Sequence, residues 1–155
     1  MSAKMNIVGK CFALSGKIMS LGTAINGRRN AQILFSQLVE ASADLGAGVC
    51  AVDYLPARSM RTQQVIDLVK CAQKIIYMLN FALREGTFLK KPCTEALGYA
   101  VDIANDVNAL VQAYVAGGPV PAVSPSAEQP AALAEEKVEN PVDPDGFSAP
   151  YDGTI

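Results

Sequence analysis

The chain of 155 residues contains no histidine and no tryptophan. Without histidine, a Ser-His-Asp or Cys-His catalytic site cannot form within this chain, and the commonest protein metal ligand is missing. No two of the four cysteines form a CxxC pair, which excludes zinc-knuckle and thioredoxin-like motifs; they are Cys11, Cys50, Cys71 and Cys93. Neither GxxxxGK[ST] nor GxGxxG occurs, so no phosphate-binding glycine loop is predicted. We therefore expect a non-enzymatic protein with no metal site and no cofactor.

Two pairs of carboxylates are spaced to share a helical face, Glu40 with Asp44 and Asp102 with Asp106. Ferritin-like metal sites combine such carboxylates with Glu-x-x-His motifs, which this chain lacks. The four acids also lie off the apolar seams of their segments. Solvated helix faces are the favoured interpretation of both pairs.

Long uninterrupted apolar runs are also missing. No stretch reaches the ~18 apolar residues of a membrane span, and Lys10 and Lys17 interrupt the apolar segment near the N-terminus. The sequence predicts neither a signal peptide nor membrane association. Reduced cysteines and a cytoplasmic location fit this composition best.

Four stretches carry the apolar spacing of amphipathic helices, and no stretch shows sustained β alternation. They run from Ile7 to Ile25, from about Arg29 to Val52, from Ser59 to Leu83, and from about Pro92 to Tyr114. Short connections make consecutive helices pack antiparallel. The predicted fold is all-α: an up-down-up-down antiparallel four-helix bundle over residues 1–118, followed by a disordered C-terminal tail over residues 119–155.

Several residues are predicted to set the boundaries and contacts of these helices. Ser59 is the expected N-cap of the third helix, and Gly86 its C-cap. Arg58 and Arg61 fall in or next to the preceding loop, where they should contribute little to the stability of the core. Gly46 and Gly48 should let a neighbouring helix approach closely. The apolar stripe of the fourth helix is predicted to comprise Leu97, Val101, Ala104, Val107, Leu110, Val111 and Tyr114.

The net charge of −2 hides an asymmetry between the two parts of the chain. Residues 1–118 contain 12 Lys+Arg and 8 Asp+Glu, whereas residues 119–155 contain one lysine, seven acids and seven of the nine prolines. A basic body with an acidic tail is typical of proteins that meet a polyanion, although a solvated surface with a solubilising tail gives the same pattern. Such a tail is expected to be disordered. Its last residues include Phe147, Tyr151 and Ile155, spaced four apart, which form either a partner-docking peptide or a plain chain end.

The basic residues of the body gather at helix ends, loops and one helix face, where phosphate backbones are commonly bound. The candidate nucleic-acid-binding residues are Arg28, Arg29, Arg58, Arg61, Lys70, Lys74, Lys90 and Lys91. Tyr77 and Phe81 follow Lys74 on the third predicted helix. They either stack on bases, or pack in the core or against a neighbouring subunit.

A resemblance to a known family rests on the order of several segments. Gln37-x-x-x-Ala41-x-Ala43 precedes the glycine-containing stretch, and Arg58 and Arg61 follow it. A helix ending Lys74-Ile-Ile-Tyr-Met-Leu-Asn-Phe-Ala-Leu-Arg-Glu-Gly86 and a final helix with Ala104-Asn-Asp-Val-Asn-Ala-Leu-Val-Gln complete the pattern. Residues 7–116 thereby resemble the four-helix-bundle proteins encoded by ribosomal-RNA intervening sequences. That family includes the accessory variability determinant of diversity-generating retroelements.

The resemblance implies a non-enzymatic homo-oligomer, a ring of five subunits. For the retroelement branch it further implies binding to a reverse transcriptase and to RNA. The alternative from the residues alone is a structural or scaffold protein, in which the apolar helices assemble subunits and the C-terminal peptide mediates docking to a partner.

Overall fold

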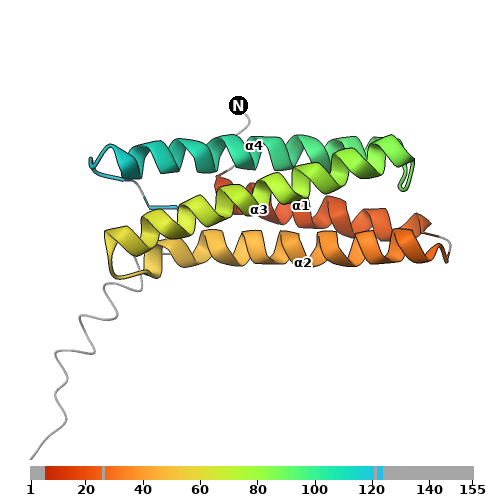
Figure 1. Ribbon diagram of the computed structural model, residues 1–155, viewed down its shortest axis with the longest axis horizontal. Helices are drawn as coiled ribbons and strands as arrows, with labels where there is room; N and C mark the ends of the chain where they lie inside the picture. The colour runs from red at the N-terminus through yellow and green to blue at the C-terminus, as the bar shows by residue number, and fades with distance from the viewer. Residues whose placement is uncertain (1–5, 26, 121, 124–155) are drawn as a thin grey trace, which may run out of the picture. The chain divides into compact units, whose positions relative to one another are not determined.

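A computed structural model describes residues 6–25, 27–120, 122 and 123 of the chain (Figure 1). Every regular element in these residues is helical, which confirms the all-α fold class with four main helices. The elements are α1 (Ile7–Leu21), η1 (Gly22–Ala24), α2 (Arg29–Ala51), η2 (Val52–Tyr54), α3 (Arg58–Glu85) and α4 (Lys90–Val115). The predicted disordered tail covers residues 119–155; the structure places residues 119, 120, 122 and 123 of it, and the others lie outside the described residues.

The helix ends follow local capping chemistry at two places. The side chain of Asn6 accepts a hydrogen bond from the Gly9 N–H at 2.7 Å, which caps the start of α1. Gly86 ends α3 in the left-handed conformation, with φ of 64°, and the Thr87 N–H donates back to the Ala82 carbonyl at 2.9 Å. The prediction of Gly86 as the C-cap is confirmed.

Two predicted helix starts were wrong by a few residues. The N-cap of α3 is Ala57 and not Ser59, so Arg58 and Arg61 lie in the first turn of the helix rather than in a loop. The guanidinium group of Arg58 anchors this turn to the end of α4. Helix α4 begins at Lys90, ahead of Pro92. Pro92 is tolerated in the first turn because the N–H that a proline lacks would have no partner within the helix there.

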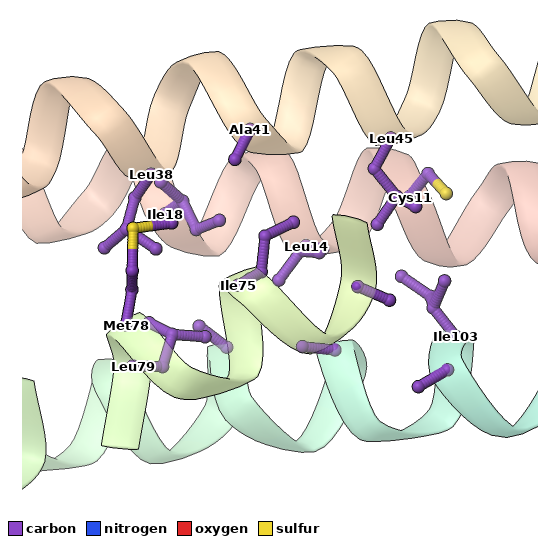
Figure 2. Close-up of a cluster of buried hydrophobic side chains, with 14 of the residues drawn as sticks. Cys11, Leu14, Ile18, Leu38, Ala41, Leu45, Ile75, Met78, Leu79 and Ile103 are labelled. Carbon is purple, nitrogen blue, oxygen red and sulfur yellow. The ribbon is translucent and has the colours of Figure 1, made fainter. Parts of the chain in front are cut away.

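The four helices surround one core. Helix α1 packs against α2 and α4, and α3 packs against the same two helices. Along α1 and α4, Lys10 pairs with Asp106 and Lys17 with Glu95, so residue numbers rise on one helix as they fall on the other. These contacts are compatible with the up-down-up-down arrangement. Figure 2 shows the interior side chains that meet between the helices, among them Leu14, Ile18, Leu38, Leu45, Ile75, Leu79 and Ile103.

The apolar stripe of α4 differs from the prediction at Val101, which is 39% exposed. The buried stripe instead passes through Ala96, Ala100 and Ile103. Small alanine side chains allow α4 to lie close to its neighbours, and this leaves Val101 on the outer surface. The prediction placed Val101 in the core because valine is larger and more apolar than the alanines beside it.

The segment after α4 also contributes to this unit of the structure. Val120 packs against the core cluster, and Val123 is itself buried within it. The backbone N–H of Val123 donates to both carboxylate oxygens of Asp53, at 3.0 and 2.8 Å. Val120 and Val123 therefore hold the segment after Gly118 against the core and η2.

Candidate polyanion-binding surface

The eight predicted basic residues occupy three separate places on the bundle. Arg28, Arg29, Lys90 and Lys91 lie at the end where α2 and α4 begin. Lys70 and Lys74 lie along the middle of α3, and Arg58 and Arg61 lie where α3 begins. Since α3 has 28 residues, it is about 42 Å long. The structure therefore does not bring the eight residues together as one rim.

The connection before α2 and the connection before α4 meet at the same end of the bundle, which we call the basic end (Arg28, Arg29, Lys90 and Lys91). Arg28 donates from its guanidinium group to the Thr87 carbonyl at 2.6 Å, which ties the two connections together. Gly27 and Gly86 both adopt positive φ, and this makes the two tight turns possible. Arg28 and Arg29 also line a surface hollow with Glu85 and Thr87.

Three helices begin with cations and have no acid in the first turn: α2 at Arg29, α3 at Arg58, and α4 at Lys90. The start of a helix carries a partial positive charge, so cations there lower its stability while anions raise it. In the described part of the chain, no hydrogen bond or ion pair engages the side chains of Arg29 or Lys90. Helix stability therefore does not explain these two residues, whereas an external anion would.

Arg58 and Arg61 have structural partners. Arg58 donates to the Tyr114 carbonyl at 3.2 Å, near the end of α4, and its guanidinium carbon lies 5.4 Å from the centre of the Tyr114 ring. The Nε–H of Arg61 donates to the Leu55 carbonyl at 2.6 Å. A cation at the last carbonyls of a helix is favourable, so Arg58 stabilises the α3–α4 contact. The expectation that these two residues contribute little to stability does not fit this geometry.

A row of exposed side chains follows α3. Lys70, Lys74, Tyr77, Phe81 and Arg84 repeat at intervals of four and three residues, which places them on one face of the helix. Tyr77 and Phe81 are 71% and 47% exposed, so neither belongs to the core. Asp67 lies beside Lys70 at 3.5 Å.

Two further lysines form contacts with acids across the bundle, and one of these acids, Asp106, is predicted from the sequence to lie on a solvated face. Lys10 Nζ lies 2.5 Å from Asp106, and Lys17 Nζ lies 2.6 Å from Glu95. The hydrogen bond and charge of Glu95 raise the pKa of Lys17, and the same contact lowers the pKa of Glu95. These ion pairs join α1 to α4, so the charges of Lys10 and Lys17 are already paired within the bundle. The spacing of seven residues between the two lysines was the signal that both face one neighbour.

An apolar groove lies between α1 and α2, with a volume of about 280 Å³. Its lining includes Cys11, Phe12, Gly46, Ala47 and Cys50. Phe12 is 74% exposed. No sequence pattern predicts this groove, because most of the side chains that line it are small and carry no distinctive spacing.

The thiols offer no sign of an activated nucleophile. Burial raises the pKa of Cys11 to about 12, with smaller contributions from Cys50 and Cys71, and burial also raises the pKa values of Cys71 and Cys93. A raised pKa keeps a thiol protonated and unreactive. All four cysteines are free thiols. Within the ranges that the structure describes, no three Cys, Asp or Glu side chains are grouped so as to hold a metal ion.

Helix α2 together with η2, Arg29–Tyr54, is long and apolar enough to cross a membrane by length and composition. The core helix of a soluble protein passes the same test, and Leu38 and Leu45 of α2 are fully buried in the bundle. Only 28% of the most apolar window of this helix is buried. The large apolar side chains that this segment leaves exposed are those of Ile33 and Tyr54.

The predicted docking residues Phe147, Tyr151 and Ile155 lie outside the described residues. Comparison of the chain with family models, with curated proteins and with solved structures finds no match.

Proposed function

We propose that this chain is a non-enzymatic, oligomeric helical-bundle accessory protein that binds RNA. The observation that carries the proposal is the placement of Arg29 and Lys90 at helix starts, where they oppose the helix dipole and lack a partner within the described bundle. Lys91 adds a third exposed cation at the same end. An anionic ligand there would gain from both the side-chain charge and the helix dipole. A phosphate backbone offers such anions in a row.

The resemblance to the intervening-sequence family supports a reverse transcriptase as the protein partner, in a cytoplasmic ribonucleoprotein of the retroelement type. It also supports a homo-oligomer, a ring of five. The exposed side chains of Phe12 on α1 and Ile33 on α2 are consistent with contacts between subunits. Co-purification of the full chain with a reverse transcriptase encoded beside its gene tests the partner, and light scattering of the full chain tests the assembly. A monomer at micromolar concentration would reject the oligomer.

The RNA proposal is tested by titrating the full chain against labelled RNA at several salt concentrations. Replacing Arg29, Lys90 and Lys91 together with glutamine should weaken binding. Removing each cation that meets a phosphate should lower the slope of log affinity against log salt by about 0.7–0.9. The matched control is Lys17→Gln, which removes a cation that is already paired with Glu95. Equal affinities and slopes for all three proteins would remove the basic end from the binding surface.

A second candidate function, a scaffold protein, is favoured by the groove between α1 and α2. An apolar groove beside an exposed aromatic ring is suited to a helix or a short apolar peptide. If the full chain binds no RNA but forms stable oligomers that Phe12→Glu dissociates, the scaffold function is the correct one.

A further inference from the structure

The exposed face of α3 combines charges and aromatic rings in a way that core packing does not require. Lys70 and Lys74 precede Tyr77 and Phe81, and Arg84 follows them on the same face. We call this set of five residues the α3 stripe. The core side of the same turns is filled by other residues, among them Ile75, Met78, Leu79 and Ala82.

The two rings lie one helical turn apart, about 6 Å along the axis. An exposed aromatic ring leaves apolar surface in water, which is less favourable than its burial. Two such rings on consecutive turns place two π-faces on the same side of the helix. They remain exposed within the bundle, so an external ligand is needed to cover them.

Charge on the α3 stripe indicates which kind of ligand fits. Among the described residues, Lys74 and Arg84 have no hydrogen bond or ion pair, and Lys70 contacts only Asp67, at 3.5 Å. The aromatic pair is therefore flanked by a cation on each side. Cations along a backbone path with aromatic rings between them are the arrangement by which proteins hold single-stranded nucleic acid.

We infer that the α3 stripe binds single-stranded RNA, with successive bases stacking on Tyr77 and Phe81 and the adjoining phosphates on Lys74 and Arg84. The inference rests on the proposed RNA-binding function and adds the strandedness of the ligand. Every base has a π-face, so stacking here is tolerant of sequence. In a duplex the same faces are covered by neighbouring base pairs. The α3 stripe therefore selects unpaired strands, while the basic end contacts the phosphates of either form.

The test compares Tyr77→Ala/Phe81→Ala with the wild-type full chain, using a labelled single-stranded RNA and a duplex that contains the same strand. Both positions are exposed on a helix, and alanine is a strong helix former, so circular dichroism should be unchanged. Affinity for the single strand should fall roughly 5- to 150-fold for each ring removed, while affinity for the duplex should change little. The slope of affinity against salt should stay the same, because every cation that meets a phosphate is still present.

Two further variants serve as controls. Tyr54→Ala removes an exposed ring from η2, outside the α3 stripe, and should leave both affinities unchanged. Lys74→Gln should weaken binding of the single strand and reduce its salt slope by about 0.7–0.9, while affinity for the duplex should change little, because the duplex does not engage the α3 stripe.

Three results would overturn the inference while leaving the proposed function intact. They are an unchanged single-strand affinity in the double-alanine variant, an equal loss for single strand and duplex, or a loss that accompanies a smaller oligomer. The last result would assign the two rings to a contact between subunits. If the wild-type chain binds neither RNA at any salt concentration, the proposed function and the inference fail together.

Discussion

Gly48 of α2 lies so close to Leu68 of α3 that a Cβ atom added to the glycine would stand 2.6 Å from Leu68 Cδ2 and 3.0 Å from Gln64 Nε2. Gly46, two residues earlier, would place its Cβ at an ordinary 3.8 Å from Cys11 Cβ. The two glycines look alike in the sequence, yet only Gly48 is required by the packing of a neighbouring helix. Close approach at Gly48 also lets Gln64 donate to the Gly48 carbonyl at 3.3 Å.

Replacing each of these glycines with alanine should therefore have opposite effects. Gly46→Ala should stabilise the bundle by about 0.5–1 kcal/mol, because alanine is the better helix former. At Gly48 the same gain is outweighed by overpacking, which typically costs about 1–3 kcal/mol. Urea unfolding at one fixed protein concentration measures both. Equal stabilisation of the two variants would contradict the close approach of α2 and α3 at Gly48.

Arg58→Gln should lower the free energy of unfolding by about 1 kcal/mol. The change removes the hydrogen bonds to the last carbonyls of α4 and the stacking of the guanidinium group on Tyr114. Arg29→Gln is the matched control, because Arg29 also begins a helix but has no such partner among the described residues. It should leave stability unchanged or raise it slightly, since it removes a cation from a helix start. Identical urea midpoints for the two variants would contradict the structural role of Arg58.

The raised pKa of Cys11 predicts a loss of stability at alkaline pH. Above about pH 9 the thiol ionises in the unfolded chain, while in the folded bundle it stays protonated up to a pKa of about 12. The unfolded state then binds fewer protons, so the free energy of unfolding falls as pH rises through this window. Cys71 and Cys93 shift in the same direction. The stability difference between wild type and Cys11→Ala should therefore shrink between pH 9 and pH 11. A constant difference would mean that water reaches Cys11.

Helix periodicity predicted the fold class because the apolar spacing of each helix is dominated by large residues such as Leu14, Leu38 and Ile75. The prediction was wrong at Val101 and Ser59, where the outcome depends on tertiary contacts. Alanines rather than Val101 line the core side of α4. The hydrogen bond from Arg58 to the Tyr114 carbonyl holds the first turn of α3, which begins before the expected cap at Ser59. The candidate site was predicted as a list of basic residues. The structure places these residues at three separate positions on the bundle. That separation depends on which helices pack together and where each one ends, and no local sequence pattern contains this information.

Truncation at two positions should separate the role of residues 119–123 from that of the acidic segment beyond them. Ending the chain after Ser124 keeps the buried side chain of Val123 and the two hydrogen bonds from its N–H to Asp53. Ending it after Gly118 removes these interactions together with Val120. We expect the shorter form to lose about 2 kcal/mol of unfolding free energy, most of it from the burial of Val123, and the longer form to match the full chain.

Both truncated forms lack all seven acids of the tail, so both should bind RNA more tightly than the full chain if the tail competes with polyanions for the basic surface. The tightening should be similar in the two forms and should diminish at high salt, because screening weakens the tail and the RNA alike. Urea unfolding and RNA titration on the same three proteins distinguish the two effects. A longer form that is as unstable as the shorter one would show that residues beyond Ser124 support the fold. If both forms bind RNA as the full chain does, the acidic tail does not compete for the basic surface.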